Sequence, residues 1–188
     1  MEQKKVYIIH GYNAGPEKHW FPWLQKRLAE QSVAADILKM PSPAQPRLGE
    51  WVAHIAQNVN TLDGNTFFVG HSLGCISLLH FLQQNAGGKA VGGLLLVSGF
   101  AKPLHGLTLL DEFSEPPLNE DLLIKTATRR AVVASKNDPI VPFSFTKELA
   151  GLLQADFFEV EHGGHFLGAE GFTTLPLVYD ILIKMIKT

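Results

Sequence analysis

The chain has 188 residues, of which 46% are hydrophobic and 18% charged, and its mean hydropathy is +0.08. This composition predicts one globular domain, 1–188, and excludes a disordered chain, which would lack the apolar side chains needed to offset the entropy lost on ordering. Sixteen Lys and Arg oppose eighteen Asp and Glu, a formal charge of −2, so no basic excess is available for nucleic acid as the main partner.

Apolar runs and amphipathic segments alternate along the chain. Short apolar runs predict six strands, at residues 6–9, 34–38, 66–69, 91–97, 130–135 and 156–160. Apolar residues three and four apart predict helices at 19–30, 48–60, 73–84, 143–153 and 172–186. Pro176 must lie in the first turns of the last helix or delay its start. The alternation predicts an α/β fold, with a doubly wound, mostly parallel sheet and right-handed crossovers.

Two stretches interrupt this alternation. Residues 41–46 contain three prolines and predict a stiff loop. Residues 100–128 contain Pro103, Pro116, Pro117 and several acidic residues. A long insertion of this kind is either a small lid over the site or an ordinary surface crossover with short helices. Neither stretch marks a domain boundary.

No segment has the length of a membrane span, about 20 apolar residues, or of a secretory signal, about 7–15. The N-terminal apolar run covers only residues 6–9, and glycines interrupt the run at 91–101. Cys75 is the single cysteine, so no internal disulfide can form. We therefore expect a cytoplasmic protein without membrane association, with Cys75 as a buried packing residue rather than a reactive thiol.

The string Gly70-His71-Ser72-Leu73-Gly74 matches the pattern G-x-S-x-G, between a predicted strand and a predicted helix. This is the context of a nucleophile elbow, in which a sharp turn exposes the serine hydroxyl and glycines leave room for neighbouring backbone. A chance string in a glycine-flanked turn is the plain alternative. The position between strand and helix favours Ser72 as nucleophile, with the Leu73 amide as an oxyanion donor.

A serine nucleophile needs a histidine base that an acid orients, and in this fold the chain order is Ser, acid, His. Asp138 follows the predicted strand 130–135, and His165 follows the strand 156–160. Parallel strands bring these ends to the same sheet edge as Ser72. The weaker alternatives are a turn or capping role for Asp138, one of the acids of the 100–128 stretch (Asp111, Glu112 and Asp121), and His162 as the base.

The loop after the first strand contains His10-Gly11-Tyr12-Asn13 and lacks any phosphate-binding glycine motif. We expect Tyr12 to supply the second oxyanion amide. Apolar side chains wall most small-molecule sites, and the tentative substrate-binding set is Asn13, His71, Trp20, Phe21 and Phe166. His162 and His165 have a spacing seen in metal sites, but no third ligand recurs nearby, so no metal or other cofactor is expected.

Several strings together resemble the α/β-hydrolase superfamily over nearly the whole chain. They are residues 7–12, the aromatic segment 19–24, residues 70–75, residues 137–142 and residues 163–166. More narrowly, they resemble the small serine hydrolases of the retinoblastoma-binding protein nine and YdeN family. The resemblance implies a compact α/β-hydrolase fold without a large cap domain, and it places Ser72, Asp138 and His165 on the family's triad positions. The retinoblastoma-binding string L-x-C-x-E is absent, so that partner is not carried over.

We therefore expect a carboxylesterase-like serine hydrolase that cleaves a small acyl ester or amide through an acyl-enzyme. One alternative is thioester cleavage or acyl transfer on the same triad, because the acceptor is chosen by pocket shape. The other is a protein-interaction module whose hydrolase site is vestigial. The expected partner is a small-molecule acyl substrate, and the sequence does not indicate an oligomeric state.

Overall fold

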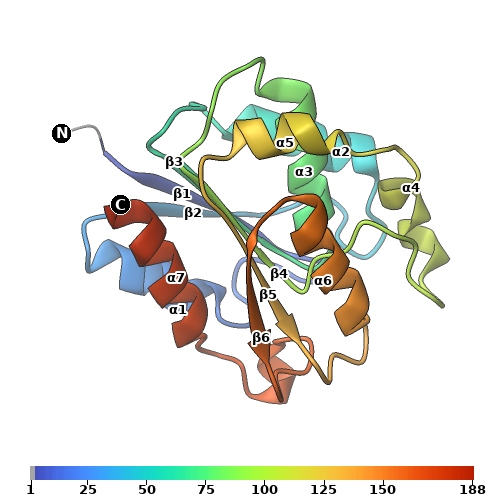
Figure 1. The fold of residues 1–188 in the computed structure, drawn as a ribbon. Coiled ribbons are helices and arrows are strands. Elements are labelled where there is room, and N and C mark those ends of the chain that lie inside the picture. Colours follow the sequence, from blue (N-terminus) through green and yellow to red (C-terminus); the bar gives the residue numbers. More distant parts are fainter. Residues whose placement is uncertain (1–2) are drawn as a thin grey trace.

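A computed structural model describes residues 3–188. Its described residues form a single sheet of six parallel strands in the order β2-β1-β3-β4-β5-β6 (Figure 1). The strands are β1 (Lys5–Ile9), β2 (Ala34–Leu38), β3 (Thr66–His71), β4 (Gly93–Val97), β5 (Arg130–Ser135) and β6 (Asp156–Val160). The predicted doubly wound α/β fold is confirmed, and within residues 3–188 no large cap covers the sheet.

Helices cover both faces of the sheet (Figure 1). The longer ones are α1 (Phe21–Ala29), α2 (Leu48–Asn58), α3 (Leu73–Asn85), α6 (Phe143–Leu152) and α7 (Pro176–Lys187). One core cluster packs α2, α3 and α6 on one face, and a second packs α1 and α7 on the other. Pro176 is the first residue of α7, since its fixed φ suits the first turn, so this helix begins four residues later than the apolar spacing predicts.

The 100–128 stretch is attached to the rest of the fold by several hydrogen bonds and holds three short helical segments. They are η1 (Thr108–Leu110), α4 (Asp111–Ser114) and α5 (Glu120–Thr126). The Glu112 carboxylate accepts a hydrogen bond from the Leu48 amide at the start of α2. On α3, His80 Nε2 lies 2.8 Å from the Phe113 carbonyl oxygen, to which it donates. These contacts fix α4 against the face that α2 and α3 form.

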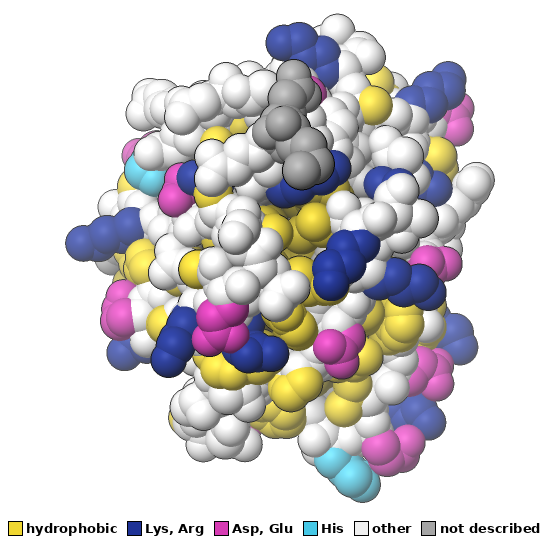
Figure 2. Space-filling view, turned by 90° about the vertical axis from the view of Figure 1, so that its left-hand side faces the viewer, with side chains coloured by type: hydrophobic (Ala, Val, Ile, Leu, Met, Phe, Trp, Pro, Cys, Tyr) yellow, Lys and Arg dark blue, Asp and Glu magenta, His cyan; other side chains and the backbone are white. Residues whose placement is uncertain are grey.

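The face in Figure 2 lies over α1 and α7 and carries charges of both signs. Lys and Arg side chains are interspersed with Asp and Glu side chains, with hydrophobic side chains between them. Among the described residues on this face, no broad patch of one sign is seen. A mixed surface of this kind produces little long-range steering of a charged partner. Separately, none of the helices within residues 3–188 is long and apolar enough to cross a membrane.

Two glycines with opposite surroundings provide a test of the packing of α3. A Cβ at Gly74 would lie 2.3 Å from the Ile9 carbonyl oxygen and 2.7 Å from that of His10, whereas a Cβ at Gly151 in α6 meets nothing within 4 Å. Gly74→Ala should lower the free energy of unfolding by about 1–3 kcal/mol or more, as overpacking does. Gly151→Ala should raise it by about 0.4–1 kcal/mol. Urea unfolding measures both, and equal effects would contradict this account of the packing.

Candidate active site

Ser72 lies in the turn that joins β3 to α3. Its backbone has φ 53° and ψ −122°, a region that non-glycine residues rarely adopt and that costs about 1–3 kcal/mol. The Ser72 amide donates to the Val97 carbonyl oxygen at 2.9 Å, and its own carbonyl accepts from the Cys75 amide at 2.9 Å. The neighbouring strand and the first turn of the helix therefore hold the strained residue in place.

Glycines allow backbone to approach Ser72 closely. At Gly70, a Cβ would lie 2.9 Å from the Cys75 Cα, in the first turn of α3. A Cβ at Gly11 would lie 2.9 Å from the Ser72 Cβ. The loop after β1 can therefore pass directly beside the serine. This packing explains why the G-x-S-x-G pattern needs its glycines, and why a glycine also follows β1.

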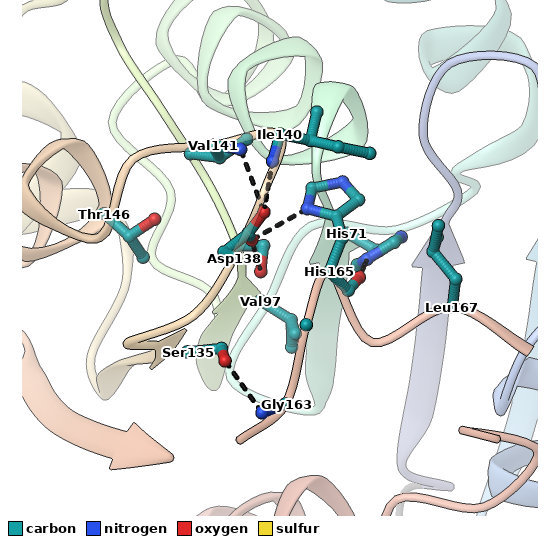
Figure 3. Close-up of polar contacts among 12 residues, drawn as sticks. His71, Val97, Ser135, Asp138, Ile140, Val141, Thr146, Gly163, His165 and Leu167 are labelled. Carbon is teal, nitrogen blue, oxygen red and sulfur yellow. Dashed lines mark hydrogen bonds and ion pairs between the residues drawn. The ribbon is translucent and has the colours of Figure 1, made fainter. Parts of the chain in front are cut away.

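Asp138 follows β5, and its carboxylate is satisfied on both oxygens (Figure 3). Oδ1 accepts hydrogen bonds from the amides of Ile140 and Val141, each at 2.9 Å. Oδ2 accepts from Ser98 Oγ at 2.9 Å and lies 2.8 Å from His165 Nδ1. The side chain is only 1% exposed. A buried carboxylate with these donors is held in one orientation toward the imidazole.

His165 lies in the loop after β6, and three contacts fix it. Nδ1 donates to Asp138 Oδ2, because an ionised carboxylate can only accept. The proton on Nδ1 leaves Nε2 with a lone pair, as a general base requires. The His165 amide donates to Glu170 Oε2 at 2.9 Å, and its carbonyl accepts from His71 Nε2 at 2.9 Å (Figure 3).

A second set of hydrogen bonds joins the Asp138 loop to the His165 loop. Ser135 Oγ accepts from the Gly163 amide at 2.8 Å (Figure 3), and Asn137 Oδ1 accepts from the Gly164 amide at 2.8 Å. Ser135 also donates to Asn137 at 2.7 Å. These bonds fix the two loops relative to each other and thereby fix the distance between Asp138 and His165.

Ser72 and His165 line one cavity of about 270 Å³ at the carboxyl edge of the sheet. Its wall combines the loop after β1, the turn before α3, part of the 100–128 stretch and the loops after β5 and β6. The lining residues are Gly11, Tyr12, Asn13, Ala14, His19, His71, Ser72, Leu104, Leu107, Leu110, Ile140, His165 and Leu167. None of these described residues is Asp, Glu, Lys or Arg.

The two expected oxyanion donors lie beside this cavity. Tyr12 lines it, and Leu73 is the first residue of α3, where backbone amides have no acceptor within the helix. The β1 loop is fixed from outside, because the Asn13 amide donates to the Pro43 carbonyl at 2.7 Å and His10 Nε2 accepts from the Met40 amide at 3.1 Å. The oxyanion role of Tyr12 and Leu73 stays a prediction.

The expected substrate-binding set needs a correction. Asn13 and His71 line the cavity, but Trp20, Phe21 and Phe166 do not, and each is fully buried at 0% exposure. These large aromatic side chains pack in the core between the sheet and the pair α1 and α7. They support the cavity from below and do not form its surface.

Six residues that line the cavity in place of these aromatics were not predicted from the sequence. They are His19, Leu104, Leu107, Leu110, Ile140 and Leu167. The three leucines recur every third residue in the 100–128 stretch, a signal that could have been noticed. His19 opens the aromatic segment, but nothing in the sequence distinguishes it from its neighbours.

The alternative acids and base lie elsewhere. Glu112 binds the start of α2 and pairs with Arg47 at 3.0 Å. In the described structure the carboxylate in contact with His165 is that of Asp138, not that of Asp111 or Asp121. His162 is exposed and lies outside the lining of the cavity. Among residues 3–188, no group of three or more His, Cys, Asp or Glu side chains is placed to hold a metal ion.

Burial favours the neutral form of three histidines near Ser72. Desolvation lowers the pKa of His10, of His19 and, most strongly, of His71. The neutral His71 donates through Nε2, so its buried Nδ1 is an acceptor, with no partner in the described structure. Cys75 is also buried, and desolvation raises the pKa of its thiol, in agreement with a packing role.

Two wider hollows lie away from Ser72. One, of about 550 Å³, lies beside β5, β6 and α7 and includes Arg129, Asp156 and Lys184 in its lining. The other, of about 730 Å³, includes Ser32 and Ile186. Neither lining contains a histidine, whereas the cavity at Ser72 combines a serine in a nucleophile-elbow turn with a histidine that a carboxylate orients. The smaller cavity at Ser72 is therefore the candidate active site.

Comparison with known proteins gives concordant matches over most of the chain. A family model described as "Serine hydrolase" matches residues 6–184. The YdeN protein of Bacillus subtilis (strain 168) is 54% identical over 179 residues, which are 95% of this chain and 94% of that protein. The serine hydrolase RBBP9 of Rattus norvegicus is 26% identical over 184 residues, 95% of each chain. The crystal structure of the B. subtilis ydeN gene product has a TM-score of 0.97 at 52% identity, covering 99% of this chain and 100% of that one.

The buried His71 predicts a loss of stability in acid. The unfolded side chain takes up a proton near its ordinary pKa of 6.5, whereas burial lowers the pKa of the folded one. The unfolded state thus binds more protons as the pH falls below about 6.5, and the free energy of unfolding decreases there, by at most about 1.4 kcal/mol per pH unit. His71→Gln, which keeps a donor for the His165 carbonyl, should show a shallower dependence in urea unfolding between pH 7.5 and 5. An unchanged slope would contradict the assignment.

Proposed function

Because the chain belongs to the serine hydrolase family, we propose that it is a carboxylesterase-type enzyme that cleaves an ester, or the related amide, of a small acyl substrate. The observation that carries the proposal is the 2.8 Å contact between Asp138 Oδ2 and His165 Nδ1, in a loop whose histidine shares a cavity with Ser72. A serine hydroxyl is a poor nucleophile at neutral pH and needs such an oriented base.

The proposed reaction has two halves. His165 Nε2 takes the proton of Ser72 Oγ while that oxygen attacks the substrate carbonyl carbon. The tetrahedral intermediate collapses when the carbon–oxygen bond to the alcohol breaks, and His165 gives its proton to the departing oxygen. His165 then takes a proton from water as the water oxygen attacks the acyl-serine, and it returns a proton to Ser72 Oγ as the bond between the acyl carbon and Oγ breaks, which releases the carboxylic acid. Asp138 orients the imidazole and stabilises its protonated form.

The amides of Tyr12 and Leu73 are the proposed donors to the negative oxygen of the intermediate. Leu73 lies at the N-terminus of α3, whose dipole favours negative charge. Each preorganised donor of this kind contributes on the order of 10²-fold to the rate or more. Serine, histidine and backbone amides thus supply nucleophile, base and oxyanion site, and the proposed reaction needs no metal or organic cofactor.

The lining of the cavity favours an uncharged substrate with a short apolar acyl group. None of the described lining residues is acidic or is Lys or Arg, so a charged substrate would be desolvated there without a counter-ion. Leu104, Leu107 and Leu110 form one apolar wall. A volume of about 270 Å³ is below the usual range for drug-sized ligands, roughly 300–1,000 Å³. We therefore propose the leucine wall as the acyl-binding surface.

The nucleophile is tested by covalent labelling. A fluorophosphonate probe should react with the purified wild-type protein, because attack by Ser72 Oγ on phosphorus expels fluoride. Ser72→Ala should lose all labelling, while Ser144→Ala, on the exposed start of α6, should label like the wild type. In-gel fluorescence measures the result. An unlabelled wild type, or a labelled Ser72→Ala variant with correct folding by circular dichroism, refutes the proposed function.

The proposed acyl-binding wall is tested with p-nitrophenyl esters of different acyl chain lengths. Leu107→Trp should shift the preferred p-nitrophenyl ester toward acetate and lower kcat/KM for hexanoate by about tenfold or more, because the indole fills the acyl space. Leu109→Ala is the matched control, since Leu109 is 45% exposed and does not line the cavity. Its chain-length profile should equal that of the wild type. An identical profile for all three proteins would show that the acyl group binds elsewhere.

A further inference from the structure

His19 is a polar residue in the cavity wall to which the proposed mechanism gives no task. It is half-buried, and it has a φ of 54°, a conformation that histidine adopts more readily than most residues. Its ring lies 5.7 Å from the ring of His71, which in turn lies 5.0 Å from the ring of His165. His19 is therefore one imidazole removed from the proposed base.

One hydrogen bond determines which nitrogen of His19 carries the proton. The Gly168 amide donates to His19 Nδ1 at 2.9 Å. An amide can only donate, so Nδ1 is the acceptor nitrogen of a neutral imidazole, and Nε2 must carry the proton. The surroundings favour the neutral form, because burial and the neighbouring His165 lower the pKa of His19. Within residues 3–188, no acceptor for the Nε2–H group is found.

The position of His19 relative to the leucine wall indicates which part of a substrate it would contact. Leu104 and Leu110 belong to the core cluster on the α2 and α3 face of the sheet. Trp20 and Phe21, the next residues after His19, belong to the cluster on the opposite face. His19 and the leucines thus reach the cavity from opposite sides of the sheet edge. The hydrogen bond to Gly168 also places His19 beside the loop that carries His165.

We propose that His19 is a substrate-binding residue whose Nε2–H donates a hydrogen bond to an oxygen in the leaving-group part of an uncharged ester. The inference rests on the proposed function, in which His165 protonates the departing alcohol and the acyl group lies on the leucine wall. A site that holds a fixed donor discriminates against a substrate that leaves it unpaired. The substrate class is then an ester of a short apolar acid with an alcohol that carries an ether, carbonyl or hydroxyl oxygen.

The test compares esters that differ by one oxygen atom. The pairs are n-butyl and 2-methoxyethyl butyrate, and n-pentyl and 3-methoxypropyl butyrate, with kcat/KM divided by the rate of alkaline hydrolysis of each ester. The wild type should prefer the ether-containing member of at least one pair by about fivefold or more, the effect of one hydrogen bond. No preference in either pair overturns the inference.

Two substitutions distinguish the role of the His19 Nε2–H donor from the role of its Nδ1 contact with the Gly168 amide. Asn tolerates positive φ, and its Oδ1 can accept from Gly168, but it does not reach the place of Nε2. In His19→Asn, the corrected kcat/KM of the ether-containing ester should therefore be close to that of its alkyl partner. His19→Gln places an amide donor near Nε2 and should retain a preference. The control is His162→Asn, an exposed histidine of the neighbouring loop, which should keep the wild-type ratio and rates.

The outcomes distinguish this inference from the proposed function. If His19→Asn lowers kcat/KM for both members of a pair by the same factor, His19 only positions the Gly168 loop and the inference is wrong. If His19→Asn keeps the wild-type preference for the ether-containing ester, the inference about His19 is also wrong. In both cases the wild type still reacts with the fluorophosphonate probe. An unlabelled wild type refutes the proposed function itself.

Discussion

Gly74 brings the first turn of α3 against the backbone at the end of β1, where any side chain would lie 2.3 Å from the Ile9 carbonyl oxygen. The turn that carries Ser72 depends on this approach. Close by, Gly11 lets the loop after β1 pass directly beside Ser72. The strained Ser72 backbone persists because strand and helix are both fixed by packing. The proposed nucleophile therefore depends on one close contact between backbones.

Asp138 and His165, the proposed acid and base, depend on hydrogen bonds rather than on packing. Three loops meet at Asp138, which accepts from Ser98 after β4 and lies 2.8 Å from His165 after β6. Glu170 and Asn137 hold the backbone of the histidine loop through its amides. Each of these bonds is of modest net strength, about 1 kcal/mol, or more where a charge takes part. Together they leave little freedom for a loop that could otherwise move.

The central strands of the sheet could be predicted because burial on both faces makes β1, β3, β4 and β5 largely continuous apolar runs. The edge strands β2 and β6 are more exposed and carry charged residues, but their short apolar stretches still indicated strands. The placement of Ser72, Asp138 and His165 at one edge followed from parallel strand direction alone. The aromatic segment was harder, because an apolar side chain indicates burial without indicating what it is buried against. Trp20 and Phe21 belong to the core under the cavity, while the polar His19 reaches its surface. The leucine wall could not be placed either, since α4 is held by a partner 64 residues away.

The residues that attach the 100–128 stretch to the fold are different from those proposed to carry out the reaction. Glu112 and His80 attach α4 to α2 and α3, whereas the groups proposed to carry the reaction lie in other loops. Within the described structure, residues 104–110 make no hydrogen bond to Asp138 or His165, so substitutions there leave those bonds in place, provided that the buried Leu104 and Leu110 stay apolar. In evolutionary terms, relatives of this compact enzyme could diverge in substrate choice by changing one short segment. The same segment is the natural place to randomise in directed evolution of new esterases.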